Sequence, residues 1–165
     1  MHLSRVLRHL ALPAWYARRA FPPDGMRRIK QAIAASESRH RGELRFVVES
    51  ALPVSGIWRN QSARERAIEI FADLRVWDTE ENSGVLVYLL FAERDVEIVA
   101  DRGIHSRCGA AFWDDVCRAM EQGFAAGEFV ATAEAGISRI GAEIEKHFPA
   151  TGNDLNELPD APVQL

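Results

Sequence analysis

A chain of 165 residues and 18.5 kDa is long enough for one domain with a sizeable core and too short for two. Its composition, 47% hydrophobic and 27% charged, is typical of a folded protein and excludes a disordered or collagen-like chain. The net charge of −4 leaves no large basic face, which argues against a nucleic-acid partner.

Residues 1–23 form a basic N-terminal segment with four arginines and no acidic residue. Apolar residues recur at helical spacing between Leu3 and Leu10 and predict a short amphipathic helix that Pro13 ends. This helix could dock on its own domain or on a second copy, or it could lie on an anionic membrane surface. Both options remain open at the level of the sequence.

No membrane-crossing segment or secretory signal is expected. The longest unbroken apolar run, residues 85–92, is far shorter than the roughly 20 residues that cross a bilayer. The N-terminal apolar stretch is short and is followed by Arg18 and Arg19 instead of a small-residue cleavage site. We therefore expect a cytoplasmic protein, with peripheral membrane contact through residues 1–23 as one option.

Residues 24–149 predict one α/β domain with its elements in the order α-β-α-β-β-α-α. The sequence patterns indicate a helix over 24–39, a strand over 43–49, a loop over 51–59, a helix over 63–74 after a capping box at Ser62 and Glu65, a strand over 85–91, a strand over 96–101 after a short turn, and helices over 113–124 and 130–148. The first two strands should be parallel and the third antiparallel. The fold class is therefore a three-layer α/β/α sandwich with a short mixed sheet, followed by an acidic flexible tail over 150–165.

Cysteine and glycine usage gives two further expectations. Cys108 and Cys117 show no Cys-x-x-Cys motif and no Cys/His spacing of the zinc type, so we expect neither structural zinc nor an organic cofactor. Gly136 and Gly141 stand inside the last helix, where glycine costs about 1 kcal/mol relative to alanine. We therefore expect a close helix or sheet contact at these two positions.

Acidic and amide side chains gather at one end of the predicted sheet. The loop over 78–84 enters the second strand, residues 101–103 leave the third, and Glu43 starts the first. Oxygen ligands of this kind suit Ca²⁺ or Mg²⁺, although the spacing is not that of an EF-hand. The candidate ligands are Asp78, Glu80, Asn82 and Asp101, with Glu43, Asp114 and Asp115 as weaker candidates. The alternative is an ordinary solvated loop.

Three segments together resemble the TPM domain family. They are 82–89 (NSGVLVYL), 96–104 (VEIVADRGI) and the helical region 112–127, and the resemblance covers roughly residues 24–149. The resemblance implies a short sheet between helices, divalent-cation binding, weak acid-phosphatase activity in some members, and roles in assembling or repairing membrane proteins in others. Of the four main candidate ligands, only Asn82 and Asp101 lie within the matching segments.

Two functional hypotheses follow from these observations. The first is a binding or assembly module for a protein or membrane-protein partner, in which a Ca²⁺ or Mg²⁺ ion stiffens the acidic loops. The second is a metal-dependent phosphatase-like hydrolase, in which Asp78, Asn82 and Asp101 hold the cation, a metal-bound water attacks, and Arg102 steadies the phosphate. No serine or histidine stands in a recognisable catalytic motif, so the binding module is the first choice.

Overall fold

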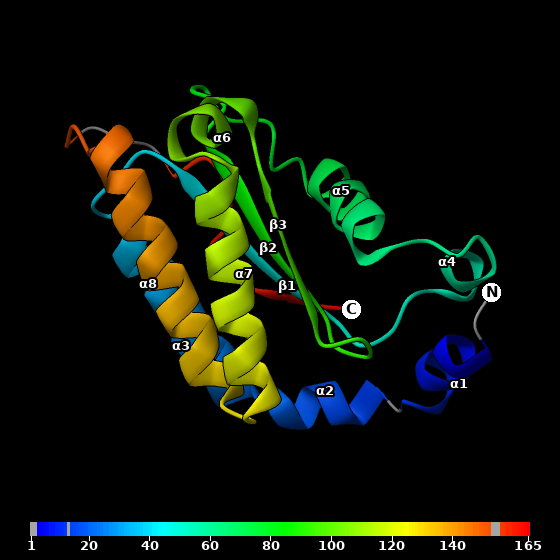
Figure 1. Ribbon diagram of the computed structural model, residues 1–165. Coiled ribbons are helices and arrows are strands. Elements are labelled where there is room, and N and C mark those ends of the chain that lie inside the picture. Colours follow the sequence, from blue (N-terminus) through cyan, green and yellow to red (C-terminus); the bar gives the residue numbers. More distant parts are fainter. Residues whose placement is uncertain (1–2, 13, 153–155) are drawn as a thin grey trace.

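A computed structural model describes residues 3–12, 14–152 and 156–165 (Figure 1). Four strands form one sheet: β1 (Glu43–Glu49), β2 (Gly84–Leu90), β3 (Asp95–Ala100) and β4 (Val163–Gln164). The helices are α1 (Leu3–Ala11), α2 (Ala14–Ala20), α3 (Pro23–Glu37), α4 (Val54–Trp58), α5 (Ala63–Asp73), α6 (Arg102–Cys108), α7 (Ala110–Ala125) and α8 (Phe129–His147).

The strands follow the order β3-β2-β1-β4. β1 runs parallel to β2 and β4, and β3 runs antiparallel to β2, which confirms the expected directions of the first three strands. In this register Glu43 lies opposite Gly84, and Val85 lies opposite Ala100. The start of β1, the start of β2 and the end of β3 therefore meet at one end of the sheet, as the sequence predicted.

Helices cover both faces of the sheet and make the predicted three-layer sandwich. α3, α7 and α8 lie on one face of the sheet, and α5 lies on the other. α4 and α1 lie beyond α5, toward the end of the sheet where β2 turns into β3 (Figure 1). Residues along each central strand alternate between the two layers. Phe46 and Val87 face α3, α7 and α8, whereas Val47 and Tyr88 face the α5 side.

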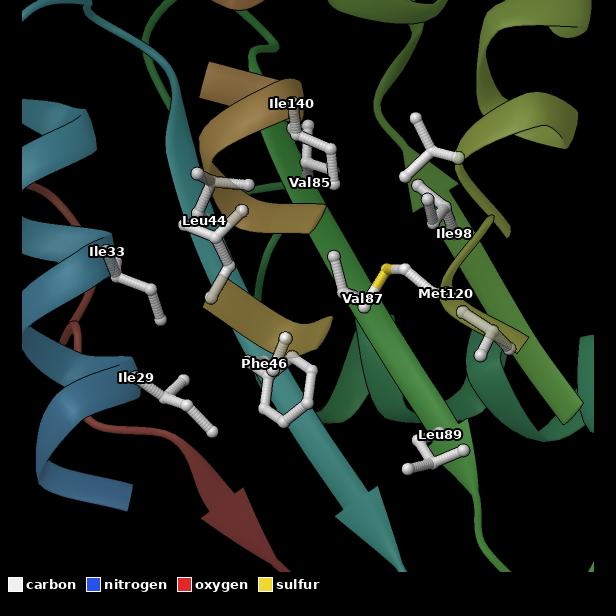
Figure 2. Close-up of a cluster of buried hydrophobic side chains, with 14 of the residues drawn as sticks. Ile29, Ile33, Leu44, Phe46, Val85, Val87, Leu89, Ile98, Met120 and Ile140 are labelled. Carbon is white, nitrogen blue, oxygen red and sulfur yellow. The ribbon is translucent and has the colours of Figure 1, made fainter. Parts of the chain in front are cut away.

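The larger core lies between the sheet and α3, α7 and α8. Figure 2 shows Ile29 and Ile33 of α3, Met120 of α7 and Ile140 of α8 converging on the strand side chains. Both central strands are buried along their whole length, which explains the continuous apolar run of β2. The smaller core, beneath α5, includes Ile70, Tyr88 and Leu158.

Close contacts explain the glycines of α8. A Cβ atom at Gly136 would lie 2.5 Å from Met120 Sδ of α7, and one at Gly141 would lie 1.7 Å from Ser36 Oγ of α3. The expected close contacts are therefore confirmed as helix–helix contacts. The capping box of α5 is also confirmed, because the Ser62 hydroxyl accepts from Glu65 N–H while the Glu65 carboxylate accepts from Ser62 N–H.

Three segments differ from the sequence expectations. The expected loop over 51–59 contains α4, and residues 102–108, which showed no apolar stripe, form α6 with Asp101 as its N-cap. The prediction of a flexible tail is wrong for residues 156–165, because β4 pairs with β1 and Leu158 is buried. The isolated acids and prolines suggested a frayed end, but the edge of β1 and the smaller core around Leu158 hold this segment. Asp154, an acidic residue of the predicted tail, lies outside the described residues.

None of the described helices combines the length and apolar character needed to cross a membrane. The basic N-terminal segment forms α1 and α2, and α1 begins and ends close to the predicted limits.

Candidate functional site

An open pocket of about 510 Å³ lies at the end of the sheet where β1 and β2 begin, and we call it the acidic pocket. Its walls come from the end of α3, the start of β1, the loop before β2 and residues 156–165, which we call the C-terminal segment. The lining residues are Ala34, Glu37, Ser38, His40, Arg41, Glu43, Glu80, Glu81, Thr151, Asn156, Glu157 and Asp160.

Two glutamates at this pocket, the half-buried Glu37 and the buried Glu43, accept backbone hydrogen bonds. Glu37 accepts from Leu44 N–H at 2.8 Å. The pKa of Glu37 is raised to about 9, chiefly by burial and also by the nearby Glu43 and Asp160 carboxylates, against the lowering effect of the Leu44 hydrogen bond. Burial also raises the pKa of Glu43. Glu37 is therefore protonated at neutral pH unless a cation compensates its charge.

The C-terminal segment closes one side of the acidic pocket. The Glu43 carboxylate accepts from the N–H groups of Glu157 and Leu158 at 3.0 and 3.1 Å, and Glu157 in turn accepts from Glu80 N–H at 3.1 Å. Arg45, which is buried, donates to the Pro159 carbonyl. The segment is therefore held by the same acids that it helps to enclose.

Arg41 and His40 form the other polar part of the pocket wall. Arg41 is paired with Glu81 and also donates to the Pro149 carbonyl at 3.1 Å. His40 Nε2 lies 2.9 Å from Ser36 Oγ, and burial lowers the pKa of His40 to about 4. His40 is therefore neutral at physiological pH, and it leaves the pocket with an excess of carboxyl groups.

The structure brings four of the predicted ligands to this end of the sheet. Glu43 and Glu80 line the acidic pocket. Asn82 and Asp101 lie beside it: Ile104 N–H donates to the Asn82 carbonyl, and Asp101 N–H donates to the Gly84 carbonyl. One Asp101 oxygen caps α6 by accepting from Arg102 N–H at 2.7 Å, while its Oδ2 is buried and has no hydrogen-bond partner among the described residues.

The remaining predicted residues lie apart from the pocket lining. Asp78 is exposed in the turn after α5, and Asp114 and Asp115 are exposed in the early part of α7, where Asp115 pairs with Arg118. Arg102 is exposed at the start of α6. The predicted acidic ligands do not form a cluster: in the described part of the chain, no three of them bring their carboxylate oxygens within 4.8 Å of one another. The cation site stays a prediction.

Sequence reasoning missed Glu37, Glu81, Glu157 and Asp160 as pocket residues. Glu37 looked like a surface position of its helix, and the last two belonged to a segment expected to be free. The sequence did offer one signal. All charged residues of the C-terminal segment are acidic, and Arg45, in the middle of a buried strand, needs a partner that such a segment can provide.

A second distinctive surface lies over α1 and α2, which we call the N-terminal surface. Of the nine strongly exposed large hydrophobic side chains in the described chain, four belong to these two helices: Leu7, Leu10, Trp15 and Tyr16. Arg8, Arg18 and Arg19 are exposed on the same helices. Trp15, Tyr16 and Arg19 also line an open groove of about 900 Å³ against the start of α8.

Charged contacts attach α1 to the rest of the domain. Arg5 Nε and His9 Nε2 both lie 2.6 Å from Glu93 Oε1, and His9 Nδ1 accepts from Leu52 N–H at 3.1 Å. Because Nδ1 is the acceptor, Nε2 carries the proton and donates to Glu93. Burial raises the pKa of Glu93, but the His9 and Arg5 hydrogen bonds outweigh it and lower that pKa below its ordinary value.

Comparisons with known proteins are consistent with this architecture. The model of the TPM domain family matches residues 18–143. A solved structure with the same fold is the NMR structure of the BA42 protein from the psychrophilic bacterium Bizionia argentinensis, with a TM-score of 0.76 and 27% sequence identity over 86% of this chain and 93% of that chain. Among curated proteins, none gives a significant match.

Proposed function

We propose that this chain, which belongs to the TPM domain family, is a binding module that attaches through its N-terminal surface to an anionic membrane surface, beside a membrane-protein partner. In this proposal a Ca²⁺ or Mg²⁺ ion in the acidic pocket stiffens the opposite end of the sheet. The observation that carries the proposal is the group of exposed apolar side chains among exposed arginines on α1 and α2.

The N-terminal surface has the composition of an interfacial contact. Trp15 and Tyr16 are 57% and 49% exposed, and their rings lie 5.5 Å apart. Aromatic side chains of this kind insert at the boundary between lipid headgroups and acyl chains, while arginines attract anionic headgroups. The anchoring of Arg5 and His9 to Glu93 keeps α1 on the domain, so binding would place the whole domain against the membrane.

The acidic pocket supports the cation part of the proposal. A divalent ion would exchange the proton of Glu37 for a positive charge near several carboxylate oxygens, among them those of Glu43, which are the ligands that hard cations prefer. Such an ion would also tie the C-terminal segment to the start of β1, because Glu157 and Glu43 share that wall.

Cosedimentation with phospholipid vesicles tests the membrane contact. The full chain should bind vesicles that contain phosphatidylglycerol, bind neutral phosphatidylcholine vesicles weakly, and lose binding as salt increases. Because each arginine near an anionic surface contributes about 1 kcal/mol, the double variant Arg18→Ala/Arg19→Ala should bind at least about tenfold more weakly. Trp15→Ala should weaken binding as well.

Matched controls use equally exposed residues at the other end of the sheet. Trp77, which is 50% exposed just before the acidic loop, and Arg102 on α6 provide Trp77→Ala and Arg102→Ala, which should bind like the unmodified chain. Equal losses from both sets of variants, or no preference for anionic vesicles, would exclude the N-terminal surface as the membrane contact.

The second candidate function is a metal-dependent phosphatase. The observation that favours it is the combination of an open acidic pocket, a buried unpaired oxygen on Asp101 and Arg102 on the adjoining helix. A cation held there would supply a nucleophilic water, and Arg102 would bind the phosphate of a phosphomonoester. Asp101→Asn should then abolish turnover of p-nitrophenyl phosphate with Mg²⁺ or Ca²⁺, whereas Asp115→Asn on α7 should leave it unchanged. No turnover with either metal would dismiss this candidate and leave the binding module intact.

A further inference from the structure

Three potential metal ligands from two helices meet on the face of the domain where α6 packs against α8. Cys108 is the last residue of α6, and Glu143 and His147 are one turn apart near the end of α8. Their ligand atoms all lie within 4.8 Å of one another, and His147 Nε2 lies 3.5 Å from Glu143 Oε1. All three residues are half-buried.

From this cluster we infer a transition-metal site, with Zn²⁺ as the expected ion, in which Cys108, Glu143 and His147 are the protein ligands and water takes the fourth position. Thiolate and imidazole are the ligands that Zn²⁺ selects over Ca²⁺ and Mg²⁺, and a carboxylate completes a set of three. The site is separate from the acidic pocket, since none of the three residues lines that pocket.

The surrounding structure holds the two helices in register. The Arg107 guanidinium donates to the His147 carbonyl at 3.1 Å and lies over the Phe148 ring at 4.5 Å, and Ile104 anchors α6 in the core. Helical spacing of i and i+4 places Glu143 and His147 side by side on one face of α8. The three ligand atoms, all within 4.8 Å of one another, are therefore held close to the separations that ligands of one ion require.

One neighbouring charge opposes the metal. Lys146 Nζ lies 2.5 Å from Glu143 Oε2, so it occupies one oxygen of a proposed ligand and repels a cation. The Lys146 side chain is 66% exposed and can turn into solvent when an ion binds. Lys146→Gln should consequently tighten metal binding, an effect opposite to that of changing any ligand.

Titration calorimetry of the full-length, untagged, metal-free chain with Zn²⁺ tests the site. We expect one Zn²⁺ per chain, binding at least tenfold weaker in Cys108→Ser and in His147→Gln, and no displacement by excess Ca²⁺. Co²⁺ in place of Zn²⁺ should give a thiolate-to-cobalt charge-transfer absorption that disappears in Cys108→Ser.

Two variants serve as matched controls for ligand type. Cys117→Ser changes the other cysteine, and His105→Gln changes an exposed histidine on α6 itself, so both should bind Zn²⁺ like the unmodified chain. Circular dichroism of every variant checks that the fold is intact. Unchanged Zn²⁺ affinity in both ligand variants, or Co²⁺ binding without the thiolate absorption, would overturn the assignment, as would absence of binding at millimolar Zn²⁺.

Discussion

Buried charge is handled differently at the two ends of the sheet. At the acidic end, Glu37 and Glu43 accept hydrogen bonds from backbone N–H groups and have other carboxylates among their charged neighbours, and burial raises the pKa of both. At the opposite end, Glu93 accepts from the Arg5 and His9 side chains, and its pKa is lowered. The acidic end thus keeps a protonated Glu37 that a cation could ionise, whereas the opposite end neutralises its half-buried Glu93 carboxylate with Arg5 and His9.

This difference also separates what each end offers to a ligand. At the N-terminal end, Arg5 and His9 anchor α1 to the domain. The other arginines of α1 and α2 are exposed, on the same helices as the exposed aromatic rings. The acidic end has the reverse arrangement, with its charges directed into a pocket that the C-terminal segment helps to close. The first arrangement suits a broad surface, and the second suits a small ion.

The largest effect should come from loosening the C-terminal wall of the acidic pocket. Leu158 is 8% exposed and packs with Val47 and Leu86 in the smaller core. Leu158→Ala should lower the free energy of unfolding by about 2–3 kcal/mol, as expected for a buried leucine. Urea unfolding measures this loss.

Leu165 provides the matched control for that substitution. It is 49% exposed in the same segment, and its hydrogen bonds to Val48 and Ser50 use its backbone groups, which the substitution retains. Leu165→Ala should therefore change stability by less than about 0.5 kcal/mol. Equal and small effects of the two substitutions would mean that residues 156–165 do not pack against the sheet in solution.

A smaller effect is expected from the anchor of α1. Glu93→Ala removes the ion-pair partner of Arg5, which keeps its bonds to Asn60 and Gln61, and leaves the fully buried His9 side chain without its acceptor. We expect a loss of about 2 kcal/mol in the free energy of unfolding. Glu134→Ala is the control, because Glu134 pairs with the exposed Arg28 and no buried side chain depends on it, so the pair should contribute less than about 1 kcal/mol. A similar loss in both variants would remove the contrast between a carboxylate that holds a buried histidine and one that pairs with an exposed arginine.

Much of the fold could be predicted because each central element carries its own pattern. The strand limits of β1 and the capping box at Ser62 followed from local spacing, and the parallel pairing followed from the helix between β1 and β2. α4 and α6 were missed because they are only five and seven residues long, which is too short for an apolar stripe to repeat.

The sites were harder to predict because their members come from distant parts of the chain. Glu37, Glu43 and Asp160 meet only after the C-terminal segment has packed beside β1, and that packing depends on a two-residue strand and a single buried leucine. Similarly, Cys108 meets Glu143 and His147 through the packing of α6 on α8. The i, i+4 spacing of Glu143 and His147 was the one local signal of that cluster.

The smallest predicted effect concerns the protonation of Glu37. Its pKa is about 9 in the folded chain and 4.5 as the ordinary value, so the folded state binds one more proton than the unfolded state between these limits. The stabilisation linked to this proton is complete below pH 4.5 and is lost as the pH rises toward 9; because Glu37 is only half-buried, solvent screening keeps the loss well below the limiting slope of about 1.4 kcal/mol per pH unit. Glu43 and Asp95 have raised pKa values and act in the same direction, while neutral His40 acts oppositely between pH 4 and 6.5.

Replacing Glu37 isolates its share from those other groups. Glu37→Gln keeps an uncharged side chain that can still accept the Leu44 hydrogen bond, so its stability relative to the unmodified chain should increase by about 1 kcal/mol or more from pH 5 to pH 8. Thermal melts at the two pH values measure the difference, and Glu128→Gln on an exposed position should show none. Saturating Mg²⁺ should reduce the gain at pH 8, because an ion in the acidic pocket compensates the Glu37 charge that the substitution removes. A pH-independent difference would mean that Glu37 is ionised throughout, and the acidic pocket would then hold its charge without a proton to exchange.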